Sequence, residues 1–340
     1  MLWTIVQLVV SLAAILGAAV LFTNAVEILG ERLNLGGGAV GSVLAAVGTA
    51  LPETMILLVT IVSSLISGSS GTNQISIGAI IGAPFLLMTL GMFVVGVSAW
   101  GFRRRRETGT EISVHKEVTR RDLGYFLPFF FVAGAAGFLP LPFLVKVGLV
   151  AVLLGAYAYY VWRTIKGSGE GEVDSPDNLL LWSSEWGVPP TWAALAQLVV
   201  PVVIMAAGAH CFVQSVEHIW QTIGVPVGFI ALILAPLATE LPEKFNSVYW
   251  LRDNKDPIAV GNISGATVFQ STVPVSLGLL FTPWTLDLLA GLVVGLALVA
   301  GSALFLMVRS QKALRGAWLV GGGLLYAAFV AAAIATILVQ

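Results

Sequence analysis

Long apolar segments, repeated along the whole chain, constrain this sequence more than any other feature. A helix needs roughly 20 apolar residues to cross a bilayer, and ten candidate segments can be marked. They cover residues 3–30, 38–66, 73–101, 125–140, 142–162, 191–221, 227–250, 257–281, 285–308 and 316–338. Only 10% of the 340 residues are charged, against about 25% in a soluble domain. We therefore predict an all-α integral membrane protein with about ten transmembrane helices.

The basic residues are distributed unevenly between the predicted connections. All of the 17 Lys and Arg residues except Lys146 and Lys244 lie in connections that follow the odd-numbered segments. Cytoplasmic connections of membrane proteins carry the excess of Lys and Arg, so we expect these connections in the cytoplasm. An even number of spans then places both termini outside, with the protein in the inner or plasma membrane.

The longest hydrophilic connection divides the chain into two similar halves. It predicts a cytoplasmic linker at 164–190, between a first repeat at 1–163 and a second repeat at 191–340. At an offset of 190 residues, Gly48–Glu53 aligns with Ala238–Glu243. Each half contains five predicted spans, and an odd number reverses the orientation of the second half. We therefore predict two inverted five-helix repeats, an arrangement typical of transporters whose binding site lies near the bilayer midplane.

Two carboxylates, Glu53 and Glu243, each follow a Leu-Pro pair inside these apolar segments. An ionisable side chain within the membrane is energetically costly and tends to mark an ion pathway or a proton relay. A single Pro-Glu pair is equally consistent with a simple kink in a core helix. Two pairs at matching positions favour one cation site that is built from both halves.

Further oxygen ligands lie next to each carboxylate. Thr49 and Thr239 precede the carboxylates by four residues and therefore share their helix faces. The two prolines cannot donate hydrogen bonds to the carbonyl oxygens of Gly48 and Ala238, which are left free to bind a cation. Calcium prefers six to eight such oxygen ligands, and magnesium has stricter requirements. The sequence offers no imidazole or thiolate set that would favour zinc or copper.

The segments around the two carboxylates resemble the alpha-repeats of the cation/calcium exchanger superfamily. The resemblance rests on Thr-x-x-Pro-Glu at 49–53 and 239–243, each followed by Gly-x-x-x-Gly-Ala in the next span. It extends over both repeats, with alpha-repeat regions at about 36–91 and about 226–279. It implies an antiporter that expels calcium in exchange for sodium or protons. In that superfamily the two Pro-Glu carboxylates ligate calcium, helped by the Thr hydroxyl groups and the backbone carbonyls of the same helices.

Several positions depart from the family pattern. Where the family usually ends a second motif with Asn or Asp, this chain has Leu87 in the first repeat and Gln270 in the second. Leu87 offers no ligand, and Gln270 offers an uncharged oxygen. Glu240 replaces a small hydroxyl residue, and Lys244 follows the second carboxylate. The three candidate carboxylates, Glu53, Glu240 and Glu243, together with Lys244 carry a net charge of about minus two, which suits one divalent cation. Few further polar ligands are available for sodium. This favours protons as the coupling ion, or fewer sodium ions than the family usually exchanges.

The function predicted from these features is secondary-active antiport by alternating access, with calcium exported in exchange for sodium or protons. An alternative is a proton-coupled exchanger for another divalent cation, Mn2+ or Mg2+. A passive cation channel does not require a duplicated carboxylate site of opposite orientation. An intramembrane enzyme requires a nucleophile–base pair or a metal-binding motif that the spans do not offer, so we expect no enzymatic activity.

The expected ligands and partners follow from this function. We expect no cofactor, because Ca2+ and the exchanged Na+ or H+ are transported cargo. The partners are inorganic cations and the lipid bilayer, and the basic run at 103–106 is better explained as a topology anchor than as a nucleic-acid patch. No sequence feature specifies an oligomeric state, and the composition is compatible with a monomer.

Replacing Glu53 or Glu243 with Gln keeps the shape of the side chain but removes the charge that offsets dehydration of the cation. We expect Glu53→Gln and Glu243→Gln each to abolish cation transport, while the protein still inserts and purifies as a folded species. Calcium exchange by the purified variants in liposomes measures the effect. Near wild-type rates in both single variants would contradict the assignment of these carboxylates.

Overall fold

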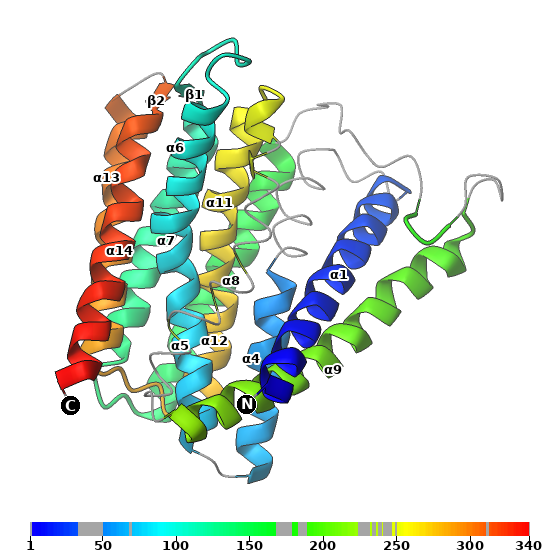
Figure 1. Cartoon of the computed structure of the whole chain (residues 1–340), viewed down its shortest axis with the longest axis vertical. Coiled ribbons are helices and arrows are strands. Elements are labelled where there is room, and N and C mark those ends of the chain that lie inside the picture. Colours follow the sequence, from blue (N-terminus) through cyan, green and yellow to red (C-terminus); the bar gives the residue numbers. More distant parts are fainter. Residues whose placement is uncertain are drawn as a thin grey trace.

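The fold is seen in a computed structural model of the chain (Figure 1). Long helices account for nearly all of the residues that the structure describes. These residues are 2–32, 50–67, 70–167, 179–182, 189–223, 232, 236, 240, 247–248, 250–310 and 313–339.

The first half of the chain forms helices in the order expected for its predicted spans. They are α1 (Leu2–Arg32), α4 (Leu51–Ser67), α5 (Ser70–Leu86), α6 (Met92–Gly101), α7 (Lys116–Ala136) and α8 (Phe143–Gly167). A π-helical segment, η2 (Leu87–Gly91), joins α5 to α6. Residues 70–101 therefore form one helical span that changes geometry in its middle.

The second half repeats this order. Its helices are α9 (Thr191–Ile223), α11 (Asp256–Gln270), α12 (Val273–Phe281), α13 (Leu288–Ser310) and α14 (Gly316–Val339). Two short strands, β1 (Glu111–Ser113) and β2 (Ala313–Arg315), pair antiparallel and join the connection after α6 to the connection after α13.

Seven helical segments within the described residues are long and apolar enough to cross a membrane. They correspond to predicted spans 1, 3, 5, 6, 8, 9 and 10. Parts of spans 2 and 7 lie outside the described residues, and α7, which corresponds to span 4, has charged residues in its first two turns. The all-α membrane architecture predicted from the sequence is confirmed.

Three local features differ from the expectation. Helix α7 begins at Lys116, whereas the predicted span begins at residue 125. The prediction was wrong here because the first two turns of the helix carry charged residues, which lower the hydropathy. The eighth span is divided into α11 and α12 by residues 271–272. The short β1–β2 ladder was not predicted, because three-residue strands in a polar connection carry no periodic signal.

Helices of the two halves pack against one another, with α7 antiparallel to α13 and parallel to α11 (Figure 1). Helix α6 packs against α14, α7 against α13 and α11, and α8 against α12 (Figure 1). Arg106, just after α6, contacts Asp256, the first residue of α11. The span formed by α5, η2 and α6 thus ends where its counterpart, α11 and α12, begins, as an inverted repeat requires.

Helices α1 and α9 form a long pair at one side of the bundle (Figure 1). A buried polar network fastens part of the linker to this pair. Asn24 Oδ1 accepts hydrogen bonds from Gln197 Nε2 (2.7 Å) and from the Leu180 backbone N–H (2.9 Å). Gln197 Oε1 accepts one from the Leu181 backbone N–H (3.0 Å). This part of the linker is therefore docked onto α1 and α9.

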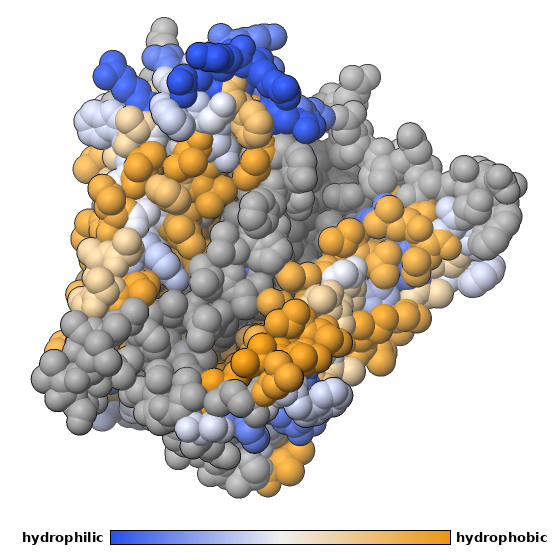
Figure 2. Space-filling model, viewed as in Figure 1, coloured by the Kyte–Doolittle hydropathy of each residue, from blue (hydrophilic) through white to orange (hydrophobic). Residues whose placement is uncertain are grey.

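Apolar side chains cover the flanks of the molecule, as expected for contact with lipid. Leu144 and Leu288 are 82% and 88% exposed. Figure 2 shows hydrophilic residues gathered at the end that holds β1 and β2, with hydrophobic residues along the helices below it. We call the end with β1 and β2 the basic end, because Arg103–Arg106 lie there.

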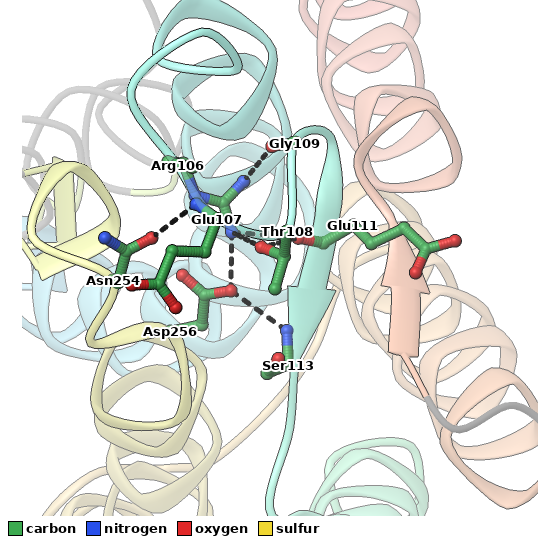
Figure 3. Close-up of polar contacts among 8 residues, drawn as sticks. All are labelled: Arg106, Glu107, Thr108, Gly109, Glu111, Ser113, Asn254 and Asp256. Carbon is green, nitrogen blue, oxygen red and sulfur yellow. Dashed lines mark hydrogen bonds and ion pairs between the residues drawn. The ribbon is translucent and has the colours of Figure 1, made fainter.

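A buried ion pair ties the two halves together at the basic end (Figure 3). Arg106 Nη2 lies 2.5 Å from Asp256 Oδ2, and the two side chains are 0% and 3% exposed. The same carboxylate oxygen accepts a hydrogen bond from the Ser113 backbone N–H (3.0 Å). Arg106 also donates to oxygen atoms of residues 108, 109 and 111. Removing one member of a buried pair is strongly destabilising, by about 3–5 kcal/mol, so this contact fixes the start of α11.

Candidate cation site

The two halves depart from regular α-helix at equivalent positions near the middle of the bundle. In the first half the π-helical segment η2 starts at Leu87. In the second half α11 ends at Gln270, which corresponds to Leu87 at an offset of 183 residues. Short π-helical segments occur frequently at functional sites. Because these positions are equivalent in the two halves, η2 and the break after α11 are expected to contribute to the same site.

A threonine hydroxyl stabilises each of these departures. Thr89 Oγ1 donates a hydrogen bond to the carbonyl oxygen of Phe85 (2.5 Å). Thr272 Oγ1 donates to the carbonyl oxygen of Val268 (2.8 Å). Donor and acceptor in the second half are again displaced by 183 residues from those in the first half.

Helix α4 begins close to the predicted Pro-Glu motif of the first repeat. Its first residue is Leu51, so that Pro52 and Glu53 occupy its first turn. Proline is well tolerated at the start of a helix, where its missing N–H has no intrahelical acceptor. The Ala50 carbonyl oxygen accepts both the backbone N–H (3.2 Å) and the side-chain hydroxyl (2.7 Å) of Thr54.

Glu240 and Gln270 meet in the interior of the protein, although they are 30 residues apart. Gln270 Nε2 donates a hydrogen bond to Glu240 Oε1, and the residues are 2% and 1% exposed, respectively. Gln270 Oε1 is buried and has no hydrogen-bond partner among the described residues. The amide therefore stabilises a buried carboxylate on one side and presents an unpartnered oxygen on the other, which is a suitable ligand for a hard cation.

A small cavity of about 10 Å3 lies beside Gln270, a volume comparable to that of one bound water. Helices of both halves line it. The lining residues are Leu57, Ala79, Ile80, Ala83, Gln270 and Pro274. Leu57 lies one helical turn after Glu53, on the same face of α4. The first-repeat carboxylate thus belongs to a helix that reaches this cavity.

The Gly-x-x-x-Gly-Ala motif of the first repeat, Gly78–Ala83, has a direct packing role. A Cβ atom on Gly82 would lie 2.5 Å from the carbonyl oxygen of Leu232 and 2.7 Å from Cγ of Pro236. Only glycine allows α5 to come so close to this segment of the second half, which precedes Glu240. The motif therefore brings the two halves together next to the candidate site.

The predicted site residues fall into three groups. Glu240 and Gln270 are described and in contact. The backbone of Glu53 is described within α4, but its side chain is not. Further predicted residues lie outside the described part of the chain, and their roles stay predictions: Gly48, Thr49, Ala238, Thr239, Glu243 and Lys244. Within the described part, no group of three His, Cys, Asp or Glu side chains is placed to hold a metal ion.

The apolar wall of the cavity was not predicted from the sequence. Ala79 and Ala83 belong to the quoted glycine motif, which was noted for its repetition and not for a contact with Gln270. Pro274, at the start of α12, was not among the predicted site residues. A glycine–alanine stripe aligned with a polar residue in the other half is the signal that points to such a wall.

Comparison with known proteins identifies the family. The model of the family described as "Sodium/calcium exchanger protein" matches residues 3–166 and 193–336. The match covers both halves of the chain and is interrupted at the predicted linker. The chain belongs to the sodium/calcium exchanger protein family, which is a family of transporters and not of enzymes. The resemblance found in the two Pro-Glu segments is confirmed.

Two curated relatives match most of the chain. "Putative antiporter CaxA" of Alkalimonas amylolytica is 23% identical over 338 residues, which cover 97% of each chain. "Inner membrane protein YrbG" of Escherichia coli (strain K12) is 24% identical over 293 residues, which cover 85% of this chain and 83% of the relative.

Two kinds of solved structure share the fold. The H+/Ca2+ exchanger CAX has a TM-score of 0.68 and 17% identity, and the match covers 98% of this chain and 91% of that one. The sodium-calcium exchanger NCX_Mj, soaked without Na+ and Ca2+, has a TM-score of 0.61 and 20% identity, with coverage of 97% and 98%. At these identities the likeness establishes the fold.

Replacing Gln270 with Leu removes the donor to Glu240 and the unpartnered oxygen at similar volume. A buried carboxylate that loses a donor is destabilised by about 1–3 kcal/mol, so we expect Gln270→Leu to raise the KM for the transported cation about tenfold. The control is Ser276→Ala, because Ser276 is buried on α12 and, among the described residues, its hydroxyl donates to the backbone carbonyl of Thr272 alone. Equal KM values for the two variants, measured in proteoliposomes, would remove Gln270 from the site.

Proposed function

We propose that this protein is a secondary-active antiporter that exports Ca2+ in exchange for H+ or Na+. The observation that carries the proposal is the buried contact between Glu240 and Gln270, beside a cavity lined from both halves of the chain. A buried carboxylate in a membrane protein is a functional residue by default. Membership of the exchanger family supplies the chemistry that such a residue serves.

The proposed cation ligands are oxygen atoms of both halves. Glu53 and Glu243 supply the principal charge, and Glu240 and Gln270 contribute from the second half. Thr49 and Thr239, with the carbonyl oxygens of Gly48 and Ala238, complete the proposed set. Oxygen ligands of this kind suit Ca2+, and Mn2+ or Mg2+ are the alternative substrates. The transported ions are the cargo, and no resident cofactor is proposed.

Alternating access is supported by the opposite directions of the two halves. The span formed by α5, η2 and α6 ends at the basic end, where α11 starts. Inverted repeats around a shared midplane site allow the site to open to either side of the membrane in turn. We propose residues 1–163 and 191–340 as these repeats, joined by a linker at 164–190.

Protons are the coupling ions that this chain favours. Leu87 is fully buried at the start of η2, where a polar residue would have to stand to bind an additional monovalent cation. The equivalent Gln270 in the second half uses its amide donor on Glu240. Carboxylates can bind protons without a complete oxygen shell. Two structural relatives are described as an H+/Ca2+ exchanger and a sodium-calcium exchanger, so the fold serves either ion in other proteins.

The proposed orientation places the basic end in the cytoplasm of the inner or plasma membrane and both termini outside. In a Cys211→Ala background, we expect a cysteine at Thr222, exposed at the end of α9, to react with an impermeant thiol reagent added to intact cells. A cysteine at Glu107, exposed at the basic end, should not react until the cells are opened. Labelling of the Glu107→Cys variant from outside would reverse the orientation.

The coupling ion is tested by calcium flux into proteoliposomes under two separate driving forces. We expect flux under an imposed pH gradient without sodium, and little additional flux from a sodium gradient at clamped pH. The reason is that Leu87 offers no ligand for a monovalent cation and that Gln270 uses its amide donor on Glu240. Flux that requires sodium, rises with more than the second power of its concentration and ignores pH would contradict proton coupling.

A further inference from the structure

A buried carboxylate outside the proposed site joins three helices. Asp122, on α7, is 1% exposed. The Tyr160 hydroxyl on α8 donates to Asp122 Oδ1 at 3.0 Å, and the Ser264 hydroxyl on α11 donates to Oδ2 at 2.8 Å. Arg121 Nη2 lies 3.6 Å from Oδ1. Asp122 was not predicted as a buried residue, because it follows several charged residues and the sequence predicts a hydrophilic connection there.

The surroundings of Asp122 are those of a fixed anchor and not of a metal site. Both carboxylate oxygens already accept a hydroxyl hydrogen bond. The Arg121 guanidinium also lies over the Tyr160 ring, 5.3 Å from its centroid, and places a positive charge where a metal would have to approach. Breaking any one of these contacts would leave the buried charge of Asp122 less well solvated, which is energetically unfavourable. Asp122 therefore restricts the positions of the residues that it contacts.

Aromatic rings continue this contact towards the cation site. Tyr157 stacks on Tyr160, with ring centroids 6.1 Å apart. Tyr157 also packs edge to face against Phe269 of α11, at 5.7 Å. Phe269 directly precedes Gln270. Asp122, Tyr160 and Tyr157 therefore form a cradle for the second half of α11, and we call these three residues the α11 cradle.

Helix α11 is thus held by the first half of the chain at two levels. Its first residue, Asp256, is bound by Arg106 and by the Ser113 backbone N–H at the basic end (Figure 3). Ser264, eight residues later, is bound by Asp122. Gln270 follows Ser264 by six residues, or about 9 Å along a helix. A helix held only at its start can swing about that point, whereas a second anchor fixes the position of its end.

We propose that Asp122 is a positioning residue for cation binding. It holds Ser264 directly and Phe269 through Tyr160 and Tyr157, and these contacts fix the position of Gln270 relative to Glu240. This inference rests on the proposed function, because Gln270 is proposed as a ligand. Asp122 itself touches no cation. Weakening the cradle lowers the affinity of the site for its cation and leaves the maximal rate of exchange nearly unchanged.

The test compares Ser264→Ala and Asp122→Asn with the control Ser276→Ala and the conservative variant Ser264→Thr. Loss of one hydrogen bond to a charged group corresponds to about a tenfold effect when it is felt in full. We expect Ser264→Ala and Asp122→Asn to raise the KM for Ca2+ about three- to tenfold, with Vmax within about twofold of wild type. Ser264→Thr, which keeps the hydroxyl, should restore the wild-type KM, and Ser276→Ala should not change it.

A second measurement separates this inference from the proposed function. A cation that binds the folded state raises the unfolding temperature by an amount that increases with the ratio of its concentration to its Kd. The unfolding temperature of the purified full chain is therefore recorded against Ca2+, Mn2+, Mg2+ and Na+ concentration, which requires no transport. We expect Ser264→Ala to need about three- to tenfold more cation than wild type for the same rise, each rise being measured from that protein's own unfolding temperature without cation, which loss of the buried hydrogen bond lowers in the variant.

The outcomes are distinct. Folded Ser264→Ala and Asp122→Asn proteins with wild-type KM and wild-type cation titrations would overturn the positioning role while leaving antiport intact. Loss of the pH dependence of transport in Asp122→Asn at an unchanged KM would also overturn it, because Asp122 would then carry the proton. A wild-type protein that neither transports nor is stabilised by any of the cations would contradict the proposed function, and the positioning role with it.

Discussion

The interior of a bilayer supplies no water to hydrogen-bond exposed backbone groups, and this constraint decides where the helices of this protein can be irregular. The start of α4, the π-helical segment η2 and the break between α11 and α12 all lie in the protein interior. At each one a threonine, Thr54, Thr89 or Thr272, donates its hydroxyl to the carbonyl oxygen four residues earlier. The break after Gln270 lies directly beside the contact between Gln270 and Glu240, where we propose the cation site.

The site belongs to the interface between the two halves and to neither half alone. Helix α11 comes from the second half, yet its polar anchors, Arg106 and Asp122, come from the first. Gly82 of the first half permits the close approach of the segment that leads to Glu240. Contacts from the first half therefore hold the segments of the second half that line the candidate site.

Much of this account could be predicted from the sequence, because the membrane imposes a simple pattern on it. Hydropathy and basic residues gave the helical spans, and the repeated Pro-Glu motif gave the family. The contact between Glu240 and Gln270 could not be predicted, since two ligands 30 residues apart meet only through tertiary packing. The π-helical segment η2, which starts at Leu87, could not be predicted either. A π-helical turn has no characteristic amino-acid composition, and Leu87 is one of many apolar residues in its span. Asp122 was missed because a charged residue beside Arg121 reads as solvated, whereas folding buries it against hydroxyl groups from two other helices.

Obligatory exchange at one site is tested by calcium counterflow. Proteoliposomes are loaded with labelled calcium and diluted into buffer with or without unlabelled calcium outside. Both sides are free of sodium and at the same alkaline pH, so that neither sodium nor protons replace calcium in the exchange. A shared site that must be occupied in order to reorient releases label much faster when calcium is present outside. The account predicts this acceleration, and it predicts that the acceleration saturates with outside calcium. Release of label at the same rate with and without outside calcium would show a passive pathway and would contradict the account.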